Sequence, residues 1–354
     1  MMKPFSLLVK PVGGACNLAC KYCFYSDHAG GVMPEAVCER MLDTYAALPF
    51  KEKAVALQGG EPLLSPDYIF DRMDAASVDR SLQTNGTLLT PERADRLRRG
   101  NWLVGLSLDG PPALNARRYA RRHEFTPVGT SQEMLAQDAF DQAVRGIRLL
   151  EDFGVDYNLL TVVSRGNVGR AREIYRYFRE NFTTRYYQFI ECTGPCEEIT
   201  GEEWGRFLCE LFDEWVQADA YTISIRTFDS IVSQLVRGIP TQCSFADGCN
   251  LYLVVEHDGS VYPCDFHVRE DLKLGNVMTH SWEQMLSSPV YRRFAERKCA
   301  GLSQTCRVCR YFGYCHGDCP RNRCAGRSTL CAGWKRFFAH TLGRFEDLVA
   351  NLPR

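Results

Sequence analysis

Three cysteines near the start of the chain lie on one short loop and indicate a metal centre. They are Cys16, Cys20 and Cys23, with three and then two residues between them. Thiolates are soft ligands that suit iron–sulfur clusters or zinc. Three protein ligands are one fewer than a closed four-coordinate site needs, and open positions are where metal chemistry takes place. A four-iron cluster on this loop would leave one iron for a non-protein ligand; a structural zinc site or unrelated thiols are the alternatives.

Composition and charge limit the class of protein. The net charge of −1 gives no bias toward nucleic acid. No run of ~18 apolar residues predicts a membrane span, and the first residues do not resemble a signal peptide. We therefore expect a cytoplasmic protein with neither a nucleic-acid nor a membrane partner. Thiols stay reduced in that compartment, so the ten cysteines from Cys243 to Cys331 predict a second metal-bearing region.

Strand-like and helix-like segments alternate in the first half of the chain. Short β-rich runs occur at residues 6–11, 54–58, 80–83, 103–108, 156–163 and 186–191. Helical periodicity is present between them, as at residues 34–48 and 138–153. This alternation predicts an α/β fold with a parallel sheet and helices outside it. Residues 111–137 predict a long loop, either a flap over the sheet ends or a solvated insertion.

Glycine-containing motifs follow three of the predicted strands. The sequence Gln58-Gly59-Gly60-Glu61-Pro62 ends the second strand, and its two glycines let the backbone approach a ligand closely. Asn85-Gly86 and Asp109-Gly110-Pro111 end the next two strands. Taken alone, each motif is ordinary turn chemistry.

The C-terminal part combines a ligand run with a hairpin. By spacing alone, one four-thiolate cluster or one closed zinc site would be held by Cys306, Cys309, Cys315 and Cys319. Residues 254–266 predict a β-hairpin that presents Cys264 with Asp265 beside it. Ionisation of a carboxyl group is disfavoured next to an anionic cluster, and this suits a proton acceptor. A solvated turn carboxylate is the alternative for Asp265.

Several of these motifs together resemble one family. The C-x3-C-x2-C loop with an aromatic residue before its third cysteine, followed by Gly-Gly-Glu-Pro, resembles radical S-adenosylmethionine (radical SAM) enzymes. The segments around Asn85, Asp109 and Asp265 resemble those of anaerobic sulfatase-maturating enzymes, and the C-terminal cysteines resemble their twin-cluster SPASM domain. The resemblance implies a partial (β/α)6 TIM-like barrel with bridging helices over residues 1–235 and a small SPASM domain over residues 236–354.

The resemblance also implies a set of cofactors and ligands. The cofactors would be S-adenosylmethionine and three 4Fe-4S clusters, the first of them on Cys16, Cys20 and Cys23. The first auxiliary cluster would be held by Cys243, Cys249, Cys264 and Cys319. The second would be held by Cys306, Cys309, Cys315 and Cys331. No role is predicted for Cys192, Cys196, Cys299 and Cys324.

The same resemblance implies which residues surround S-adenosylmethionine. They are Tyr22, Tyr25, Gln58, Gly59, Gly60, Glu61, Ser107, Arg118 and Leu160. The Gly-Gly-Glu motif would hold the methionine amino group, Ser107 the ribose or carboxylate, and Leu160, at the end of the fifth strand, the adenine. The family usually has an arginine twelve residues after the serine; here that residue is Tyr119, and the adjacent Arg118 would replace it.

The activity implied is oxidation of a Cys or Ser side chain in an unfolded sulfatase-type peptide to Cα-formylglycine. Asp265 would be the general base, and a flavodoxin- or ferredoxin-type protein the reductant. The peptide would lie between Tyr25, Gln58 and Asp265, with acidic flanks steered by Arg117, Arg118, Arg121 and Arg122. Two alternatives stay open: a maturase that forms thioether or carbon–carbon crosslinks in a ribosomal peptide, and a non-catalytic iron–sulfur electron carrier.

Overall fold

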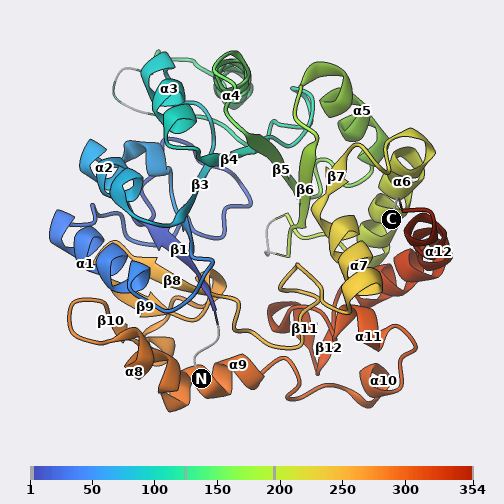
Figure 1. Ribbon diagram of the computed structural model, residues 1–354. Helices are drawn as coiled ribbons and strands as arrows, with labels where there is room; N and C mark the ends of the chain where they lie inside the picture. Colours follow the sequence, from blue (N-terminus) through green and yellow to red (C-terminus); the bar gives the residue numbers. More distant parts are fainter. Residues whose placement is uncertain (1–3, 123, 125, 194–196, 353–354) are drawn as a thin grey trace. The chain divides into compact units, whose positions relative to one another are not determined.

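The computed structural model describes residues 4–122, 124, 126–193 and 197–352 (Figure 1). The chain divides into two compact units, each assembled from segments distant in sequence. The first consists of Met1–Ser107, Arg118–Tyr157 and Asn250–Ala295. The second consists of Leu108–Arg117, Asn158–Cys249 and Glu296–Arg354. The boundary predicted at residue 236 separates two family domains, whereas these two units are defined by compactness. That boundary therefore stays a prediction.

The first unit contains a mixed sheet with the strand order β10-β9-β8-β1-β2-β3-β4. Its strands are β1 Ser6–Lys10, β2 Ala54–Leu57, β3 Asp79–Thr84, β4 Leu103–Ser107, β8 Tyr252–Glu256, β9 Ser260–Tyr262 and β10 Gly275–Asn276. The strands β1 to β4 pair in parallel, as predicted. The predicted hairpin is present as the antiparallel pair β8 and β9. Unexpectedly, β8 also pairs in parallel with β1, so the hairpin extends the sheet of the first four strands.

Helices cover the outer side of this sheet, as Figure 1 shows for α1, α2 and α3. The helices of the first unit are α1 Glu35–Ala46, α2 Asp67–Ala75, α3 Pro91–Arg99, α4 Gln132–Asp152, α8 Trp282–Ser287 and α9 Pro289–Glu296, with short 3-10 turns at Pro62–Leu64, Asp265–His267 and Glu270–Leu272. The long loop predicted at residues 111–137 is shorter than expected, because α4 begins at Gln132. The side chain of Ser131 accepts a hydrogen bond from the Met134 amide and caps this start.

Alternation along β1 and β2 sends two polar side chains to one face of the sheet. Successive side chains of a strand point to opposite faces of the sheet. Leu7 and Val9 are buried on one face, so Leu8 and Lys10 point to the other face. The register pairs Val9 with Leu57, and therefore Lys10 and Gln58 occupy neighbouring positions at the carboxyl ends of their strands. Carboxyl ends of parallel strands are where α/β folds build their sites.

The second unit contains the parallel strands β5 Tyr157–Val163, β6 Tyr186–Glu191 and β7 Ser224–Ile225. A second, antiparallel pair is formed by β11 Arg323–Cys324 and β12 Arg327–Ser328. The helices are α5 Ala171–Asn181, α6 Gly201–Ala218, α7 Arg226–Arg237, α10 Gln304–Arg307, α11 Phe312–Cys315 and α12 Cys331–Ala350, with a 3-10 turn at Pro320–Asn322. Across the described residues, each helix is too short or too polar to cross a bilayer.

A tight contact between α6 and α12 organises the core of the second unit. A Cβ atom on Gly205 would lie 2.5 Å from the Cα atom of Gly333, so both glycines are needed for this approach. Phe212 of α6 and Phe345 of α12 pack with ring centroids 4.8 Å apart. Aromatic side chains at this interface bury large apolar areas, which makes it a main source of stability.

Candidate functional site

The loop that carries Cys16, Cys20 and Cys23 follows β1 and is closed at its base by a bridge between Gly13 and Gly30. None of the three forms a disulfide. The sulfur of Cys16 accepts a hydrogen bond from the Leu18 amide at 3.4 Å, and burial raises the pKa of its thiol. A bound metal would reverse this effect, because a coordinating thiol is deprotonated.

The glycines of the Gly-Gly-Glu-Pro motif lie against this cysteine loop. The amide of Gly60 donates to the Gly13 carbonyl, and the amide of Glu61 donates to the Ala15 carbonyl, each at 2.8 Å. A Cβ atom on Gly60 would overlap the Ala15 carbonyl oxygen, and Gly59 has a φ of +132°. Glycine is therefore required at both positions to bring the motif onto the loop.

Glu61 is fully buried and is tied to the end of β3. Its carboxylate accepts hydrogen bonds from the Leu63 amide at 3.0 Å, the Thr84 hydroxyl at 2.7 Å and the Asn85 amide at 2.8 Å. Burial raises the pKa of Glu61, and these donors oppose the shift. The carboxylate thus connects the segment after β2 to the end of β3. Its contact with the methionine amino group of the cofactor stays a prediction.

Asn85, of the motif that ends β3, and Asn17, for which no role was predicted, connect β3 to the cysteine loop. The side-chain amide of Asn85 donates to the Asn17 oxygen at 2.9 Å and lies 3.8 Å from the Cys16 sulfur. Asn17 in turn donates to the Thr87 hydroxyl at 2.8 Å. Asn85-Gly86 has the signature of an ordinary turn, so only the three-dimensional arrangement reveals this network.

The segment after Arg117 also packs on the cysteine loop. Arg118 is 7% exposed, and its guanidinium donates to the Tyr22 hydroxyl at 3.0 Å. The Ala19 amide donates to the Tyr119 carbonyl at 2.8 Å, and Arg121 donates to the Leu18 carbonyl at 3.0 Å. Arg118 therefore lies beside the loop where the resemblance places S-adenosylmethionine, and its contact with that cofactor stays a prediction.

The four arginines predicted to steer acidic peptides are engaged with the chain itself. Arg117 pairs with Glu197 at 3.0 Å within the second unit. Within the first unit, Arg118 and Arg121 bind the cysteine loop, and Arg122 donates to the Thr130 carbonyl. Paired guanidinium groups attract distant charges more weakly than free ones, and steering of acidic peptide flanks by these four arginines stays a prediction.

Asp265 stands at the first position of the 3-10 turn that follows Cys264 and is 8% exposed. The amide of Gln58 donates to its Oδ2 atom at 3.1 Å. The Lys10 ammonium lies 3.9 Å from the same oxygen, and the Cys264 sulfur lies 3.7 Å from Oδ1. The structure thus brings Gln58 to Asp265, as predicted, and adds Lys10, which the sequence reading did not identify.

Tyr25 lies beside this group and is 2% exposed. Its hydroxyl donates to Glu256, and its ring stacks on His28 with centroids 4.0 Å apart. The Lys10 ammonium lies 4.5 Å from the centroid of the Tyr25 ring. Burial raises the pKa of Glu256 and of Tyr25 and lowers that of Lys10, while the charge of Asp265 opposes the change at Lys10.

The remaining two cofactor candidates lie on strands. Ser107 is the last residue of β4, at the carboxyl end, as predicted. Leu160 lies in the middle of β5 rather than at its end, because that strand continues to Val163. Both side chains are partly exposed.

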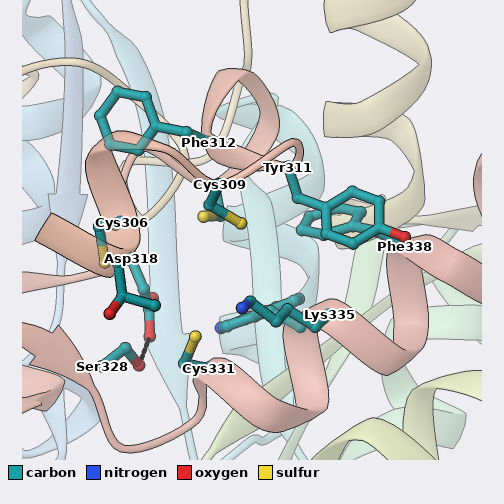
Figure 2. A pocket seen from close by; sticks show the side chains of 13 residues that line it. Cys306, Cys309, Tyr311, Phe312, Asp318, Ser328, Cys331, Lys335 and Phe338 are labelled. Carbon is teal, nitrogen blue, oxygen red and sulfur yellow. Dashed lines mark hydrogen bonds between the residues drawn. The ribbon is translucent and has the colours of Figure 1, made fainter.

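Four cysteines of the second unit line one pocket. They are the predicted second auxiliary set, Cys306, Cys309, Cys315 and Cys331. Figure 2 shows Cys309 and Cys331 directing their sulfur atoms into the same space, with Tyr311 and Phe338 to one side. Cys319 is not among the lining residues, although spacing alone grouped it with Cys306, Cys309 and Cys315. The pocket agrees with the split assignment, and ligation itself stays a prediction.

A buried cation lies among the other cysteines of this unit. Lys298 is 1% exposed and donates to the Ser244 carbonyl. Burial lowers its pKa, and the negative charges of Asp318, Cys249, Cys319 and Cys243 oppose that change. Burial raises the pKa of the Cys319 thiol to about 12. Cys264, the fourth predicted ligand of that cluster, belongs to the first unit. Cys196 lies outside the described residues.

Single-ion metal sites are not preassembled in the part of the chain that the structure describes. No group of three His, Cys, Asp or Glu side chains is close enough there to bind one ion. A four-iron cluster spaces its cysteines more widely than one zinc ion does. The pocket in Figure 2 is lined by four cysteines, the number that a four-iron cluster or a closed zinc site takes.

Comparison with known proteins identifies the family. The Radical SAM superfamily model matches residues 11–178, and the SPASM iron–sulfur cluster-binding domain model matches residues 246–310. A serine-type anaerobic sulfatase-maturating enzyme of Bacteroides thetaiotaomicron is 31% identical over 99% of this chain and 92% of that protein. A cysteine-type enzyme of Clostridium perfringens is also 31% identical, over 99% of this chain and its own full length.

A solved structure agrees with these relatives. The structure of native anSMEcpe with bound AdoMet and Cp18Cys peptide matches with a TM-score of 0.88 and 29% identity, covering 99% of this chain and 100% of that chain. The α/β fold with a radical SAM partial barrel and a SPASM domain is thereby confirmed. The chain belongs to the anaerobic sulfatase-maturating enzymes of the radical SAM superfamily.

Proposed function

We propose that this chain oxidises a Cys or Ser side chain of a peptide to Cα-formylglycine, using S-adenosylmethionine and three 4Fe-4S clusters. The observation that supports this best is the position of Asp265 within the first unit. The carboxylate is buried and held by Gln58, and Phe266, the next residue, contacts Phe24, the residue after Cys23. A base for the substrate proton thus stands next to the loop on which a radical would be generated.

The residues at this loop fit a cluster by their chemistry. Cys16, Cys20 and Cys23 offer three sulfur ligands that no disulfide consumes. Lys10 and Arg118 supply positive charge nearby, which offsets the charge of thiolates. Bound at this loop, the cluster and S-adenosylmethionine would supply the radical chemistry that removes a hydrogen atom from Cβ, and the auxiliary clusters would take up the remaining electron. For a Cys substrate, water would then replace the sulfur, which would leave as hydrogen sulfide.

The chain's own residues position the peptide and move its proton. Asp265 accepts the thiol or hydroxyl proton of the substrate residue, through the oxygen that Gln58 does not occupy. Gln58 and Tyr25 border the place where the peptide lies extended. Gly59, Gly60, Glu61, Ser107, Arg118, Tyr22 and Leu160 surround the S-adenosylmethionine. The barrel ends near residue 235, and Cys243, Cys249, Cys264 and Cys319 hold the first auxiliary cluster.

The cellular setting belongs to the same proposal. The enzyme works in the cytoplasm on a substrate that is still unfolded, because an extended segment is needed to place Cβ close to the reacting carbon. A flavodoxin- or ferredoxin-type protein supplies electrons. The net charge of −1 offers no electrostatic basis for binding nucleic acid.

The experiment that tests this function measures whether the hydrogen removed from Cβ of the substrate residue is transferred to 5′-deoxyadenosine. A peptide in which deuterium replaces both Cβ hydrogens of its Cys is turned over anaerobically with S-adenosylmethionine and a chemical reductant. We expect one deuterium in the 5′-deoxyadenosine for each residue oxidised. Oxidised peptide accompanied by 5′-deoxyadenosine without deuterium would refute abstraction from Cβ.

A further inference from the structure

Lys10 is a buried cation in direct ion-pairing range of the proposed base. Its side chain is 1% exposed, and its Nζ atom lies 3.9 Å from Oδ2 of Asp265. Long charged side chains are almost never fully buried unless they are paired. The position is set by β1, which ends at Lys10 and is paired with β2 on one side and β8 on the other.

The two oxygens of Asp265 have different surroundings. Oδ2 accepts a hydrogen bond from the Gln58 amide at 3.1 Å and lies within ion-pair range of the Lys10 ammonium. Oδ1 faces the Cys264 sulfur at 3.7 Å. A thiolate that ligates a cluster has no proton to donate, so Oδ1 would then be the oxygen without a donor from these neighbours. The carboxylate is thus held on one side and left available to a substrate proton on the other.

Two aromatic rings and several negatively charged groups surround the Lys10 ammonium. The Tyr25 ring covers it at 4.5 Å, and Phe24 lies at 6.0 Å. Glu256, on the neighbouring strand, accepts the hydroxyl hydrogen of Tyr25 and thereby fixes that ring. Glu256 itself, Cys264 and Cys23 also contribute negative charge at Lys10. A cation among these groups counteracts the repulsion between the carboxylate of Asp265 and an adjacent anionic sulfur.

We propose that Lys10 is a positioning residue, which holds Oδ2 of Asp265 and thereby aims Oδ1 toward the substrate. This inference rests on the proposed function, since it assigns Lys10 to the base of that reaction. No bond is made or broken by Lys10 itself. The substrate proton passes from sulfur or oxygen to Oδ1, and Lys10 stabilises the arrangement from which it passes.

The test compares Lys10→Met with the wild-type holoenzyme. Methionine keeps the length of the side chain and suits a buried site, so we expect unchanged iron content and unchanged cleavage of S-adenosylmethionine without peptide. The kcat for peptide oxidation should fall by about 10–100-fold, the usual effect of removing a group that orients a functional side chain, with little change in KM. Lys51→Met, at an exposed site before β2, is the matched control and should behave as wild type.

A double-mutant cycle with Asp265→Asn decides whether Lys10 acts through the base. If it does, adding Lys10→Met to Asp265→Asn lowers the residual rate by less than about threefold. Multiplicative losses would overturn the proposal, because Lys10 would then act independently of Asp265.

A second neutral variant, Lys10→Gln, guards against a defect peculiar to methionine. The same loss of kcat is expected, whereas a normal kcat in a variant with full iron content would overturn the role of the charge. These results are separate from the function itself. Suppose that the wild-type enzyme forms formylglycine while both Lys10 variants keep a normal kcat for peptide oxidation. That result would contradict the role of Lys10 and leave the proposed function standing.

Discussion

Phe24 and Phe266 pack against each other with ring centroids 4.4 Å apart and ring planes tilted by 47°. Phe24 directly follows Cys23, and Phe266 directly follows Asp265. Two segments more than half the chain apart in sequence are therefore joined at the residues next to a predicted cluster ligand and a predicted base. Such an aromatic pair contributes about 0.5–1.5 kcal/mol beyond its buried area, enough to keep the two segments in one arrangement.

Asp265→Asn is expected to remove the base while it preserves the shape of the side chain. Peptide oxidation should fall by roughly 10²–10⁴-fold, the usual contribution of a positioned base. Iron content and reductive cleavage of S-adenosylmethionine should survive. Asp271→Asn, on the exposed turn after this segment, is the matched control. Near-normal formation of oxidised peptide by Asp265→Asn would place the base elsewhere.

Replacement of the N-terminal triplet tests the assignment of the first cluster. Anaerobic reconstitution should give about twelve irons per chain, the content of three four-iron clusters. With Cys16, Cys20 and Cys23 all changed to Ala, about one third of this iron should be lost, together with all cleavage of S-adenosylmethionine. Zinc in place of iron in protein purified without oxygen would contradict the cluster assignment.

The C-terminal pocket makes a separate prediction about the auxiliary clusters. Cys309→Ala should lose about four irons, because its sulfur is directed into the pocket that Cys306, Cys315 and Cys331 also line. Cys299→Ala is the control: this exposed thiol donates to the Asp247 carbonyl at 3.5 Å and is not assigned to a cluster. Equal loss of iron in both variants would show that the ligand set has been drawn wrongly.

Part of the fold follows from local patterns, and part does not. The six predicted strands are found because short β-rich runs alternate with helical patterns along the chain, and the Asp258-Gly259 turn identifies the hairpin. The pairing of β8 with β1 was missed, since it joins Ser6 to Tyr252 and no local signal predicts so distant a contact.

The same limit explains which site residues were found. Gln58 and Asp265 were predicted to face one peptide, and a hydrogen bond of 3.1 Å connects them. Lys10 was overlooked because a lysine at the end of a strand usually points to solvent; its burial depends on the distant hairpin beside β1. The hydrogen bond between Asn17 and Asn85 was not predicted, because each is an ordinary loop residue until the fold brings them together.

Glu191 should make the stability of the second unit depend on pH. Burial and the nearby charge of Asp318 raise the pKa of Glu191 to about 7, while Asn322 donates to it at 3.2 Å. The folded chain therefore keeps a proton that the unfolded chain releases between about pH 4.5 and 7, and stability falls as pH rises through this window.

Glu191→Gln removes this titration, so its Tm advantage over wild type should be small at pH 5 and larger at pH 8. Each kcal/mol should appear as a shift of roughly 2–4 °C. Glu346→Gln, at an exposed position of α12, is the control for the loss of one charge. A Tm difference that is the same at both pH values would contradict the shifted pKa.

The most direct test of the central claim is the mass spectrum of a Cys-containing sulfatase-type peptide after anaerobic turnover, read together with its reactivity toward a hydrazine. The account predicts loss of the sulfur, gain of a carbonyl oxygen and formation of a hydrazone, as required for Cα-formylglycine. A product that keeps its sulfur, has lost only hydrogens and does not react with hydrazine would contradict it and indicate a crosslinking maturase on the same scaffold.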